Sequence, residues 1–572
     1  MHPTGRNNND AASLPQQHQQ QSQYEEEEDE HVVIVGAGMA GLACAQRLLL
    51  SNRKNRNKDN NLRVTILEAS NQAGGRIRVD NSLVPDLDLG AEFIHGQGHL
   101  LWKEWETMLN HHNKVHESNT IQEEEFETKN KKEQQQPPQS QEPYGESIFI
   151  LSHADGGPDT EPTPEGKYGM FFVHGALKAY NDPTLQPLTK AIKTVMERGQ
   201  QHNNDYDASV SMQEAILAAS SSSLPLELQD LAIAGFGNTA GCCDLSKLSV
   251  SQCVRFQEYW EANEIEGDCR PHGGMYRIVQ YLLDKLLKKG ENEGVVELKL
   301  NRPIQRIRRR KCTEKYTGKH DRVELVCVNG EKYTASRVVV TTPPKLWTNL
   351  FDDNDDDDDD KFVLPEPKRR AIQHVGMERA IKIICKFRQR LWPEQVQSVI
   401  ATNDQPIPEL WFRDVVAPAP SSSSSGSNNN TTTYHLAVGF LMSTAADNLL
   451  NAIASGGKNG DNCVSQKQDK AAEVLLTQLS TMFSISRDRL QDALLGSVFY
   501  DWMEDPYIQG GYMYPKVHMT EADFHALAAP VENKLYFAGE ATNTNACCTV
   551  QAAMETGVRA ANQILASYTQ RQ

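Results

Sequence analysis

Long hydrophobic runs are missing from this chain of 572 residues. No apolar stretch reaches the roughly 18 residues that a membrane-spanning helix needs, and the N-terminal region is a polar Asn/Gln tract instead of the apolar core of a signal peptide. The C-terminal Thr-Gln-Arg-Gln is not a peroxisomal signal of the Ser-Lys-Leu type. We therefore expect neither membrane insertion nor export, and cytoplasm is the default compartment.

The chain also lacks a Cys-x-x-Cys motif and an excess of positive charge. Its 11 cysteines are scattered, which predicts no metal site and no dense disulfide framework and favours a reducing compartment. The formal net charge is −18, and much of it lies in two acidic runs at 25–30 and 352–360 that are typical of solvated loops. This balance argues against a nucleic-acid partner and only weakly for a cationic substrate.

The length exceeds what one hydrophobic core normally supports, so two domains are expected. Low-complexity composition predicts a disordered tail at 1–30 and surface loops at 128–142, 351–361 and 418–433, because such segments bury too little apolar area to order themselves.

The remaining apolar stretches have two kinds of pattern. Short β-branched runs predict buried parallel strands, and they stand at 31–36, 64–69, 337–344 and 534–540. Helical periodicity marks AGLACAQRLLL and YRIVQYLLDKLL. The fold class is therefore α/β. One Rossmann-like domain is assembled from 31–115, 265–345 and 495–565, and a mixed α/β second domain from 116–264 and 346–494.

The first strand runs into a glycine motif, Gly36-x-Gly38-x-x-Gly41, which opens a helix, and Glu68 ends the next strand. The glycines allow a tight turn and let a pyrophosphate approach the helix N-terminus, while the acidic residue can accept hydrogen bonds from ribose hydroxyls. A glycine motif alone is weak evidence, but here strand, helix and acid all fall in place. The pattern predicts a dinucleotide site.

A second glycine turn follows at Gly74-Gly75-Arg76, and then comes LGAEFIHG at 89–96. With these blocks the chain resembles the flavin-containing amine oxidase superfamily, which includes monoamine, polyamine and spermine oxidases and the flavin lysine demethylases. VELKLNRPIQRI, YTASRVVVTTPP, GMERAIKIICKFRQRLW, DPYIQGGYMYP and FAGEAT extend the resemblance in family order over 31–565. The resemblance implies that the Rossmann-like domain binds FAD and the second domain binds substrate.

The resemblance also implies which residues contact the cofactor. Besides the glycine motif and Glu68, they are Gly74, Gly75, Arg76, Gly90, Ala91, Glu92, Ile304, Trp392, Gly539, Glu540, Thr549 and Val550. Glu92 could equally be a surface acid, and Trp392 could be plain core. Gly511 stands where monoamine oxidases carry a cysteine bonded to the flavin, so FAD is expected to be noncovalent.

Three residues are the candidates for catalysis. Lys382, seen only as part of an alternating strand, indicates a solvated lysine on an edge strand, but the resemblance aligns it with the lysine that holds a water against flavin N5. His95 could orient a substrate amine, which must lose its proton before its α-carbon gives up hydride, or it could cap a loop. Tyr512 aligns with a ring that flanks the flavin and attracts amines through its π face.

One segment departs from the family. Relatives usually have an aromatic residue or glycine where Ala546-Cys547-Cys548 stand, and His-Gly-Ala where this chain has Gln551-Ala552-Ala553. The helix that starts at Thr549–Val550 is still expected to point its positive N-terminal end at the flavin. We therefore expect flavin binding to be retained and the lining of the substrate site to differ from that of relatives.

These features predict an FAD-dependent oxidase of small-molecule amines, with polyamines favoured, in which hydride passes to flavin and O2 is reduced to H2O2. L-amino-acid or monoamine oxidation is the alternative. A hypothesis of another class is a binding scaffold that keeps FAD without using it. The sequence does not predict an oligomeric state.

Overall fold

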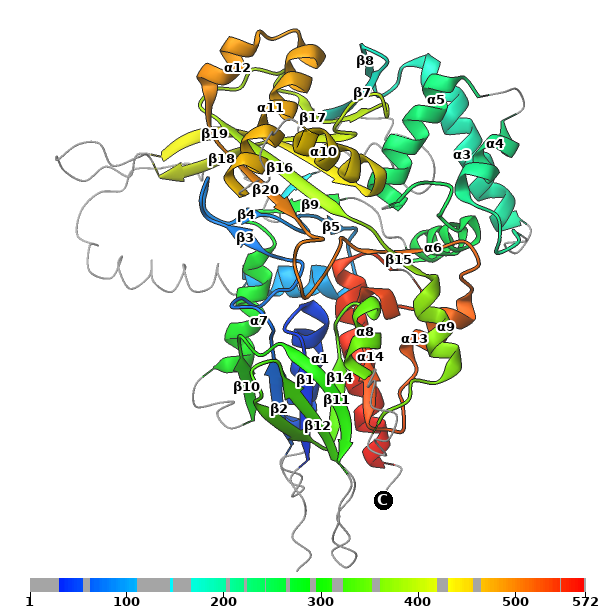
Figure 1. Ribbon diagram of the computed structural model, residues 1–572, viewed down its shortest axis with the longest axis vertical. Helices are drawn as coiled ribbons and strands as arrows, with labels where there is room; N and C mark the ends of the chain where they lie inside the picture. Colours follow the sequence, from blue (N-terminus) through cyan, green and yellow to red (C-terminus); the bar gives the residue numbers. More distant parts are fainter. Residues whose placement is uncertain are drawn as a thin grey trace, which may run out of the picture.

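The computed structural model describes residues 30–54, 62–110, 145–147, 166–201, 206–220, 224–241, 243–263, 268–288, 295–310, 322–351, 361–418, 431–455, 464–545 and 547–569. The molecule has two lobes, one built around a parallel sheet and the other around a larger, mostly antiparallel sheet (Figure 1). The tail at 1–30 lies almost entirely outside the described residues, as do the predicted loop at 128–142 and most of those at 351–361 and 418–433.

The first lobe contains a five-stranded sheet in the order β10-β2-β1-β14-β22, with all neighbours parallel. Its strands are β1 (His31–Val35), β2 (Arg63–Leu67), β10 (Val296–Lys299), β14 (Arg337–Val340) and β22 (Leu535–Phe537). The predicted parallel strands are thus confirmed. The chain enters this sheet from three separate segments, and the carboxyl ends of β1, β2, β14 and β22 meet at one edge.

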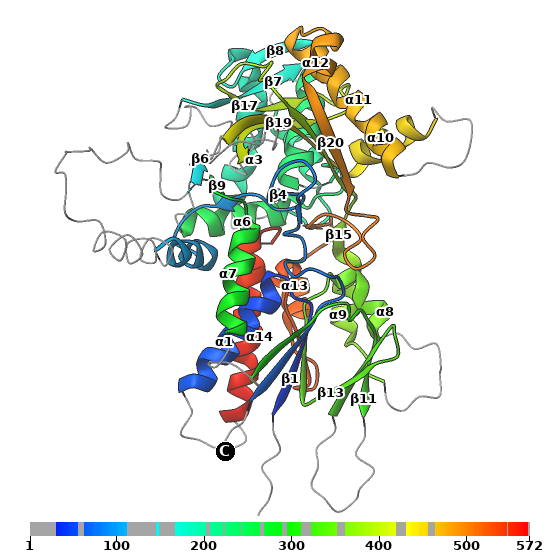
Figure 2. The same ribbon diagram turned by 90° about the vertical axis from the view of Figure 1, so that its left-hand side faces the viewer.

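Both faces of this sheet are covered, because alternate residues of each strand point to opposite sides. Val32 and Ile34 of β1 pack on one side, against α1 (Met39–Lys54), α7 (Tyr276–Leu287) and α14 (Val550–Thr569). Val33 and Val35 pack on the other side, toward β11 (Ile304–Arg310), β12 (Arg322–Cys327), β13 (Lys332–Ala335), α8 (Trp347–Phe351), α9 (Glu366–His374) and α13 (Glu521–Ala528). Figure 2 shows α1, α7 and α14 together on one side of this lobe.

The second lobe is built on a seven-stranded sheet in the order β20-β16-β19-β18-β17-β7-β8. Its strands are β7 (Tyr168–Val173), β8 (Ala176–Ala179), β16 (Ala380–Phe387), β17 (Val396–Ala401), β18 (Glu409–Pro418), β19 (Thr431–Met442) and β20 (Leu494–Asp501). One face packs against α10 (Ser443–Ser455), α11 (Val464–Phe483) and α12 (Arg487–Ala493). The opposite face is turned toward the first lobe.

The remaining elements flank the sheets. α3 (Gln186–Gln201), α4 (Met212–Ala219), α5 (Leu226–Leu231), a π-helix (Ala232–Gly241) and α6 (Val250–Ala262) form a helical group with its own core. Short strands connect the lobes: β3 (Val79–Asp80), β4 (Leu87–Asp88), β5 (Ile94–His95), β6 (Gly145–Ser147), β9 (Asp268–Pro271), β15 (Val375–Met377) and β21 (Met513–Pro515). Single 3₁₀ turns lie at Pro183–Leu185, Pro344–Leu346 and Glu540–Thr542.

The structure corrects two of the predicted domain boundaries. Residues 347–375 were assigned to the substrate domain, but Trp347 and Ala371 are buried in the core of the parallel-sheet lobe. Residues 495–501 were assigned to the FAD-binding domain, yet they form most of β20, which pairs with β16 in the second sheet. The predicted loop at 418–433 is also too long, because β18 ends at Pro418 and β19 begins at Thr431. Alternation within a segment does not reveal which sheet it joins, and for that reason the boundaries could not be placed.

Candidate active site

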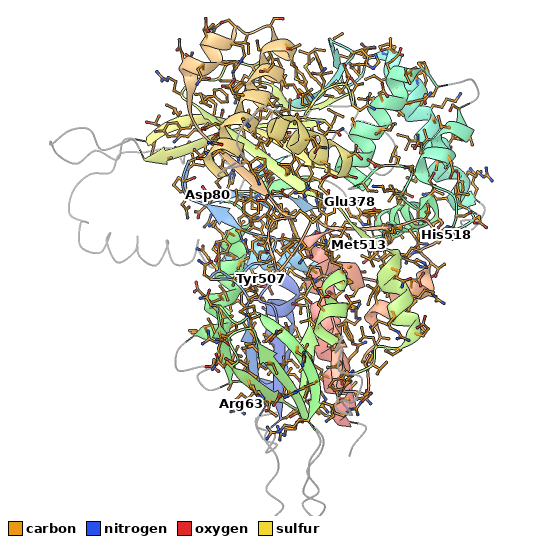
Figure 3. All side chains as sticks on the ribbon, viewed as in Figure 1. Arg63, Asp80, Glu378, Tyr507, Met513 and His518 are labelled. Atoms are coloured by element: carbon orange, nitrogen blue, oxygen red, sulfur yellow. The ribbon has the colours of Figure 1, made fainter. Side chains whose placement is uncertain are left out.

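A cavity of about 690 Å³ lies where the two lobes meet. Its lining includes Tyr507, which Figure 3 labels in the narrow region between the lobes. One end is formed by the carboxyl edge of the parallel sheet, and we call it the glycine end. The other end is formed by the face of the seven-stranded sheet that is turned toward the first lobe, and we call it the lysine end. The two ends have different construction.

Close backbone approaches form the glycine end. Gly36 has a φ of 106° and follows β1, and both it and Gly38 line the cavity. A Cβ on Gly41 would stand 2.0 Å from the carbonyl oxygen of Gly36, so this glycine lets α1 pack directly on the turn. Gly41 does not itself line the cavity, and its contribution is to hold the turn.

The second glycine turn supports the first. Gly74 donates its N–H to the carbonyl oxygen of Ala37 at 2.9 Å, and Gly75 lies against Gly38 with a φ of 61°. Glu68, at the end of β2, accepts hydrogen bonds from the N–H of Ala37 at 2.7 Å and from Ser70 at 2.9 Å. The acidic residue therefore fixes the loop as well as lining the cavity.

A charged pair closes this end of the cavity. Arg76 donates to Glu540 at 2.8 Å, and the second carboxylate oxygen of Glu540 accepts the backbone N–H of Cys548 at 3.1 Å. The lining is completed by Gly539, which has a φ of 119°, by Thr549 and by Val550, the first residue of α14.

The two adjacent cysteines are part of this wall. Cys547 and Cys548 both line the cavity, and their sulfur atoms are 3.0 Å apart. Cys548 has a φ of 71°, a left-handed conformation that favours glycine, and its thiol donates to the carbonyl oxygen of Met513 at 2.8 Å. Cys547 and Cys548, at which the sequence departs from the family, thus lie beside the contacts that Glu540 makes.

The glycine end fits a dinucleotide on physical grounds. Two turns leave backbone facing the cavity at Gly36, Gly38 and Gly75, and the N-terminal ends of α1 and α14 reach it at Met39 and Val550. Exposed N–H groups and helix N-termini bind phosphate and other anionic groups. FAD supplies such groups in its pyrophosphate.

Lys382 is the centre of the lysine end. Its ammonium group donates to Glu92 at 2.5 Å, to the carbonyl oxygen of Gly90 at 2.8 Å and to that of Asp88 at 3.3 Å. β16 lies between β20 and β19, so this lysine is not on an edge strand, and it is 6% exposed. The interpretation as a solvated surface lysine is wrong, because the tertiary structure covers that face of the strand.

Glu92 is also not a surface acid. It is buried and also pairs with Arg270 at 3.0 Å and with Arg413 at 3.7 Å. Burial opposes its ionisation, but Lys382, Arg270 and Arg413 outweigh burial and hold the pKa of Glu92 well below its usual range. Glu92 lines the cavity, and these contacts make it the partner of Lys382.

Asp88 is next to Lys382 and Glu92, since its carbonyl oxygen accepts a hydrogen bond from Lys382. Burial raises the pKa of Asp88 to about 7, with Glu92 adding to the effect and Arg413 and Lys382 opposing it. One of its oxygens accepts the N–H of Met275 at 3.3 Å. The group therefore titrates near neutral pH inside the protein.

His95 stands on β5 across from β9. Its Nδ1 lies 2.8 Å from a carboxylate oxygen of Asp268, its strand partner, and the ring is flanked by Phe93 and Trp260 at centroid distances of 6.3 and 6.1 Å. A carboxylate at Nδ1 favours the proton on that nitrogen and leaves Nε2 as the nitrogen that can accept a proton in the cavity. The interpretation as a mere loop cap does not describe this arrangement.

Tyr512 lines the cavity between the two ends. Burial, together with Cys548 and Glu540, raises the pKa of its hydroxyl far above the usual value, so the ring stays neutral. Gly511 precedes it, and a Cβ there would lie 2.9 Å from Cε of Met442. Gly90, Ala91 and Ile304 line the cavity as well.

The predicted contact of Trp392 with the cofactor is wrong. Its ring packs on Phe387 and Phe412 at 5.4 and 4.8 Å, in the core on the α10–α12 side of the sheet. Lys382 and Phe387 are five residues apart on one strand, so they point to opposite faces. Trp392 therefore packs on the face away from the cavity.

Several lining residues were not predicted from the sequence. They are Asp268, Glu409, Trp411, Phe440 and Trp260, with Arg270 and Arg413 behind them. One signal was available, since Glu409, Trp411 and Arg413 alternate along a strand whose intervening residues Leu410 and Phe412 are apolar. The others come from separate segments that only the fold brings together.

Comparisons with known proteins agree with this geometry. A sequence profile described as flavin containing amine oxidoreductase matches residues 39–565. Probable polyamine oxidase 4 of Arabidopsis thaliana is 21% identical, covering 92% of this chain and 85% of its own, and human peroxisomal N(1)-acetyl-spermine/spermidine oxidase is 24% identical, covering 93% and 94%. The solved structure of cyclohexylamine oxidase from Brevibacterium oxydans shares the fold, with a TM-score of 0.63 and 17% identity over 95% of this chain and 100% of that one.

The family match runs from the first residue of α1 to the last turns of α14, so it includes residues from both ends of the cavity. The cofactor is FAD. Gly511 stands at the position where a covalent bond between a cysteine and the flavin was considered, and glycine has no thiol to form one. The chain belongs to the flavin containing amine oxidoreductase family and is an FAD-dependent amine oxidase.

Proposed function

We propose that this protein oxidises a small amine, with polyamines favoured, and transfers the electrons to O2 to give H2O2. The observation that carries the proposal is the lining of the lysine end. Aromatic rings of Phe93, Trp411 and Phe440 stand there with the carboxylates of Asp268 and Glu409. Aromatic faces and carboxylates together attract and desolvate a cationic amine.

Three residues of the cavity would have separate roles in this reaction. FAD, when bound, supplies the acceptor for hydride from the α-carbon. His95, oriented by Asp268, would take the proton from the substrate ammonium, because only a neutral amine can give up hydride. Tyr512 would shield the reacting carbon from water. Lys382, held by Glu92, would present a fixed positive charge that favours reduction of O2.

An L-amino-acid substrate would need a cationic partner for its carboxylate. Among the described residues the cavity-lining arginines are Arg76, Arg78 and Arg302, and each pairs with a carboxylate of the protein, at 2.8, 2.6 and 2.6 Å. This pairing favours an amine without a carboxylate. A scaffold that keeps FAD unused would have no need for the buried Lys382–Glu92 pair, which is costly to bury.

The test is an anaerobic titration of the purified yellow protein with spermine, spermidine, their N-acetyl forms, simple monoamines and L-amino acids. Polyamines are expected to bleach the oxidised flavin band, and H2O2 should appear when O2 is readmitted. Bleaching by L-amino acids alone would overturn the proposal in favour of the amino-acid alternative. If none of these compounds bleaches the band, the scaffold hypothesis replaces it.

No helix in the described ranges is long and apolar enough to cross a bilayer. A small-molecule amine and O2 are the proposed partners, and nucleic acid is not. The compartment stays a prediction, and one of the similar proteins carries the word peroxisomal in its name.

A further inference from the structure

Two adjacent thiols stand in the wall of the cavity. Cys547 and Cys548 both line it, and their sulfur atoms are 3.0 Å apart. Both cysteines are free, so this distance is a contact and not a bond. The sulfur atoms of a disulfide are about 2.05 Å apart, so a movement of about 1 Å would bring these two to bonding distance. The pair is therefore one oxidation step away from a disulfide.

The two thiols differ in their surroundings. Cys547 is 4% exposed, and burial, together with its contact with Cys548, raises the pKa of its thiol well above the usual value. Cys548 is half-buried, and its thiol donates to the carbonyl oxygen of Met513 at 2.8 Å. An oxidant in the cavity therefore meets Cys548 as the more accessible thiol, and Cys547 is the neighbour that can attack it in turn.

The backbone of Cys548 connects the thiol pair to the charged pair of the glycine end. Its N–H donates to Glu540 at 3.1 Å, and the other oxygen of Glu540 accepts from Arg76 at 2.8 Å and from the N–H of Met513 at 3.3 Å. A disulfide between adjacent residues closes a small ring that contains the backbone nitrogen of the second residue. Ring closure would therefore act directly on the N–H that holds Glu540.

We propose that Cys547 and Cys548 are a site of reversible oxidation, at which a peroxide converts the two thiols into a disulfide and weakens the hold of the cavity wall on Glu540. The Cys548 sulfur attacks one oxygen of H2O2, the O–O bond breaks, and the other oxygen leaves as water with the thiol proton. The Cys547 sulfur then displaces the new hydroxyl group from Cys548, and this group leaves as a second water with the Cys547 proton. The thiols lose two electrons and two protons, and one H2O2 becomes two waters.

The adjacency of the two residues makes the product easy to reduce. Neighbouring Cα atoms are about 3.8 Å apart, below the range of about 4.4–6.8 Å that most disulfides span. Such a disulfide is strained, and strained disulfides are the ones that added thiols reduce readily. The inference goes beyond the proposed function and does not rest on it, because any peroxide that reaches the cavity serves as the oxidant.

The experiment treats the flavin-loaded protein with a few equivalents of H2O2 without amine, alkylates the remaining thiols and digests the chain with trypsin. Cleavage after Lys534 and Arg559 gives one peptide that carries Cys547 and Cys548 and no other cysteine. In the wild type this peptide is expected to be unalkylated and lighter by two hydrogen atoms, and dithiothreitol should restore both thiols. Flavin should dissociate about threefold or more faster from the oxidised protein, because the hydrogen bond to Glu540 is weakened, and at the original rate after reduction.

Two variants separate the roles of the thiols. In Cys547→Ser, Cys548 has no neighbouring thiol, so peroxide should carry it on to the sulfinic acid, which dithiothreitol does not reverse. Cys253→Ser is the matched control. Cys253 lines the same cavity, but burial raises the pKa of its thiol to about 12, which makes it a poor nucleophile. Cys253→Ser should therefore form the disulfide as the wild type does.

Two alkylated thiols in the peptide from peroxide-treated wild type would overturn the inference, and this measurement needs no variant to fold. A disulfide between Cys253 and either member of the pair would also overturn it. An unchanged rate of flavin dissociation from the disulfide form would overturn the proposed effect on Glu540. All three outcomes leave the proposed function intact, since that function fails only if amines do not reduce the flavin.

Discussion

The two ends of the cavity are built in opposite ways. At the glycine end, the structure is set by backbone, because Gly41 and Gly74 stand where a Cβ would lie within 2.3 Å of a carbonyl oxygen. At the lysine end it is set by side chains, with Lys382 and Glu92 buried as an ion pair. A backbone site tolerates few substitutions and holds a constant ligand, whereas a side-chain site can change its substrate by single substitutions.

The largest effect is expected at the glycine end, from the pair Gly38→Ala and Gly41→Ala. A Cβ on Gly38 meets no protein atom closer than 4.0 Å, while one on Gly41 meets the Gly36 carbonyl oxygen at 2.0 Å. Gly38→Ala should therefore lose about tenfold or more in FAD affinity without lowering the unfolding temperature of the apoprotein, since the methyl group would enter the cavity where the glycine turn would hold a pyrophosphate. Gly41→Ala should both weaken FAD binding and lower the unfolding temperature of the apoprotein. Flavin content and thermal unfolding measure both, and a matching loss of apoprotein stability in the two variants would contradict the distinction.

At the lysine end, Lys382→Met is expected to slow flavin reoxidation by O2 by about tenfold or more, because it removes the buried positive charge. Lys386→Met is the matched control. Lys386 lies on the same strand, where it donates to the carbonyl oxygen of Leu83 and contacts the ring of Tyr434 without lining the cavity. Stopped-flow mixing of reduced enzyme with O2 gives the rate. Equal rates in the two variants would remove the special role of Lys382.

A smaller effect concerns stability. Because burial raises the pKa of Asp88 to about 7, the folded protein binds this proton more tightly than the unfolded chain. Its contribution to the free energy of unfolding is therefore largest below about pH 4 and declines as the pH rises to about 7, by up to roughly 4 kcal/mol. Asp88→Asn should remove this decline and be more stable than the wild type at pH 8 but not at pH 4. Urea unfolding across this range tests the sign, and parallel pH curves for the two proteins would refute it.

The smallest effect is expected from Cys548→Gly. The φ of 71° suits glycine, and the backbone N–H that binds Glu540 is kept, which offsets the lost thiol bond. Flavin content should be unchanged, and KM for the amine should stay within about threefold. A large rise in KM would place the cysteine pair in the substrate site instead of the wall beside the cofactor.

The sequence predicts more of the glycine end of the cavity than of the lysine end. Gly36, Gly38 and Glu68 could be identified because they act within a short strand–turn–helix–strand unit, whereas Gly74 and Gly75 were implied by the resemblance to the family. Trp392 was misplaced because its role was taken from the resemblance to the family, and the sequence does not say on which side of the sheet the ring packs. Asp268 was missed because it acts through His95, which is remote in sequence.

The sequence by itself determined the parallel strands and the glycine turns, because these depend on periodicity and on conformations that only certain residues adopt. Its motif blocks carried the resemblance to the family. The tertiary structure decided the domain boundaries and the burial of Lys382 with Glu92. These features depend on which strands pair and in what register, and pairing between distant segments is fixed only when the whole core packs.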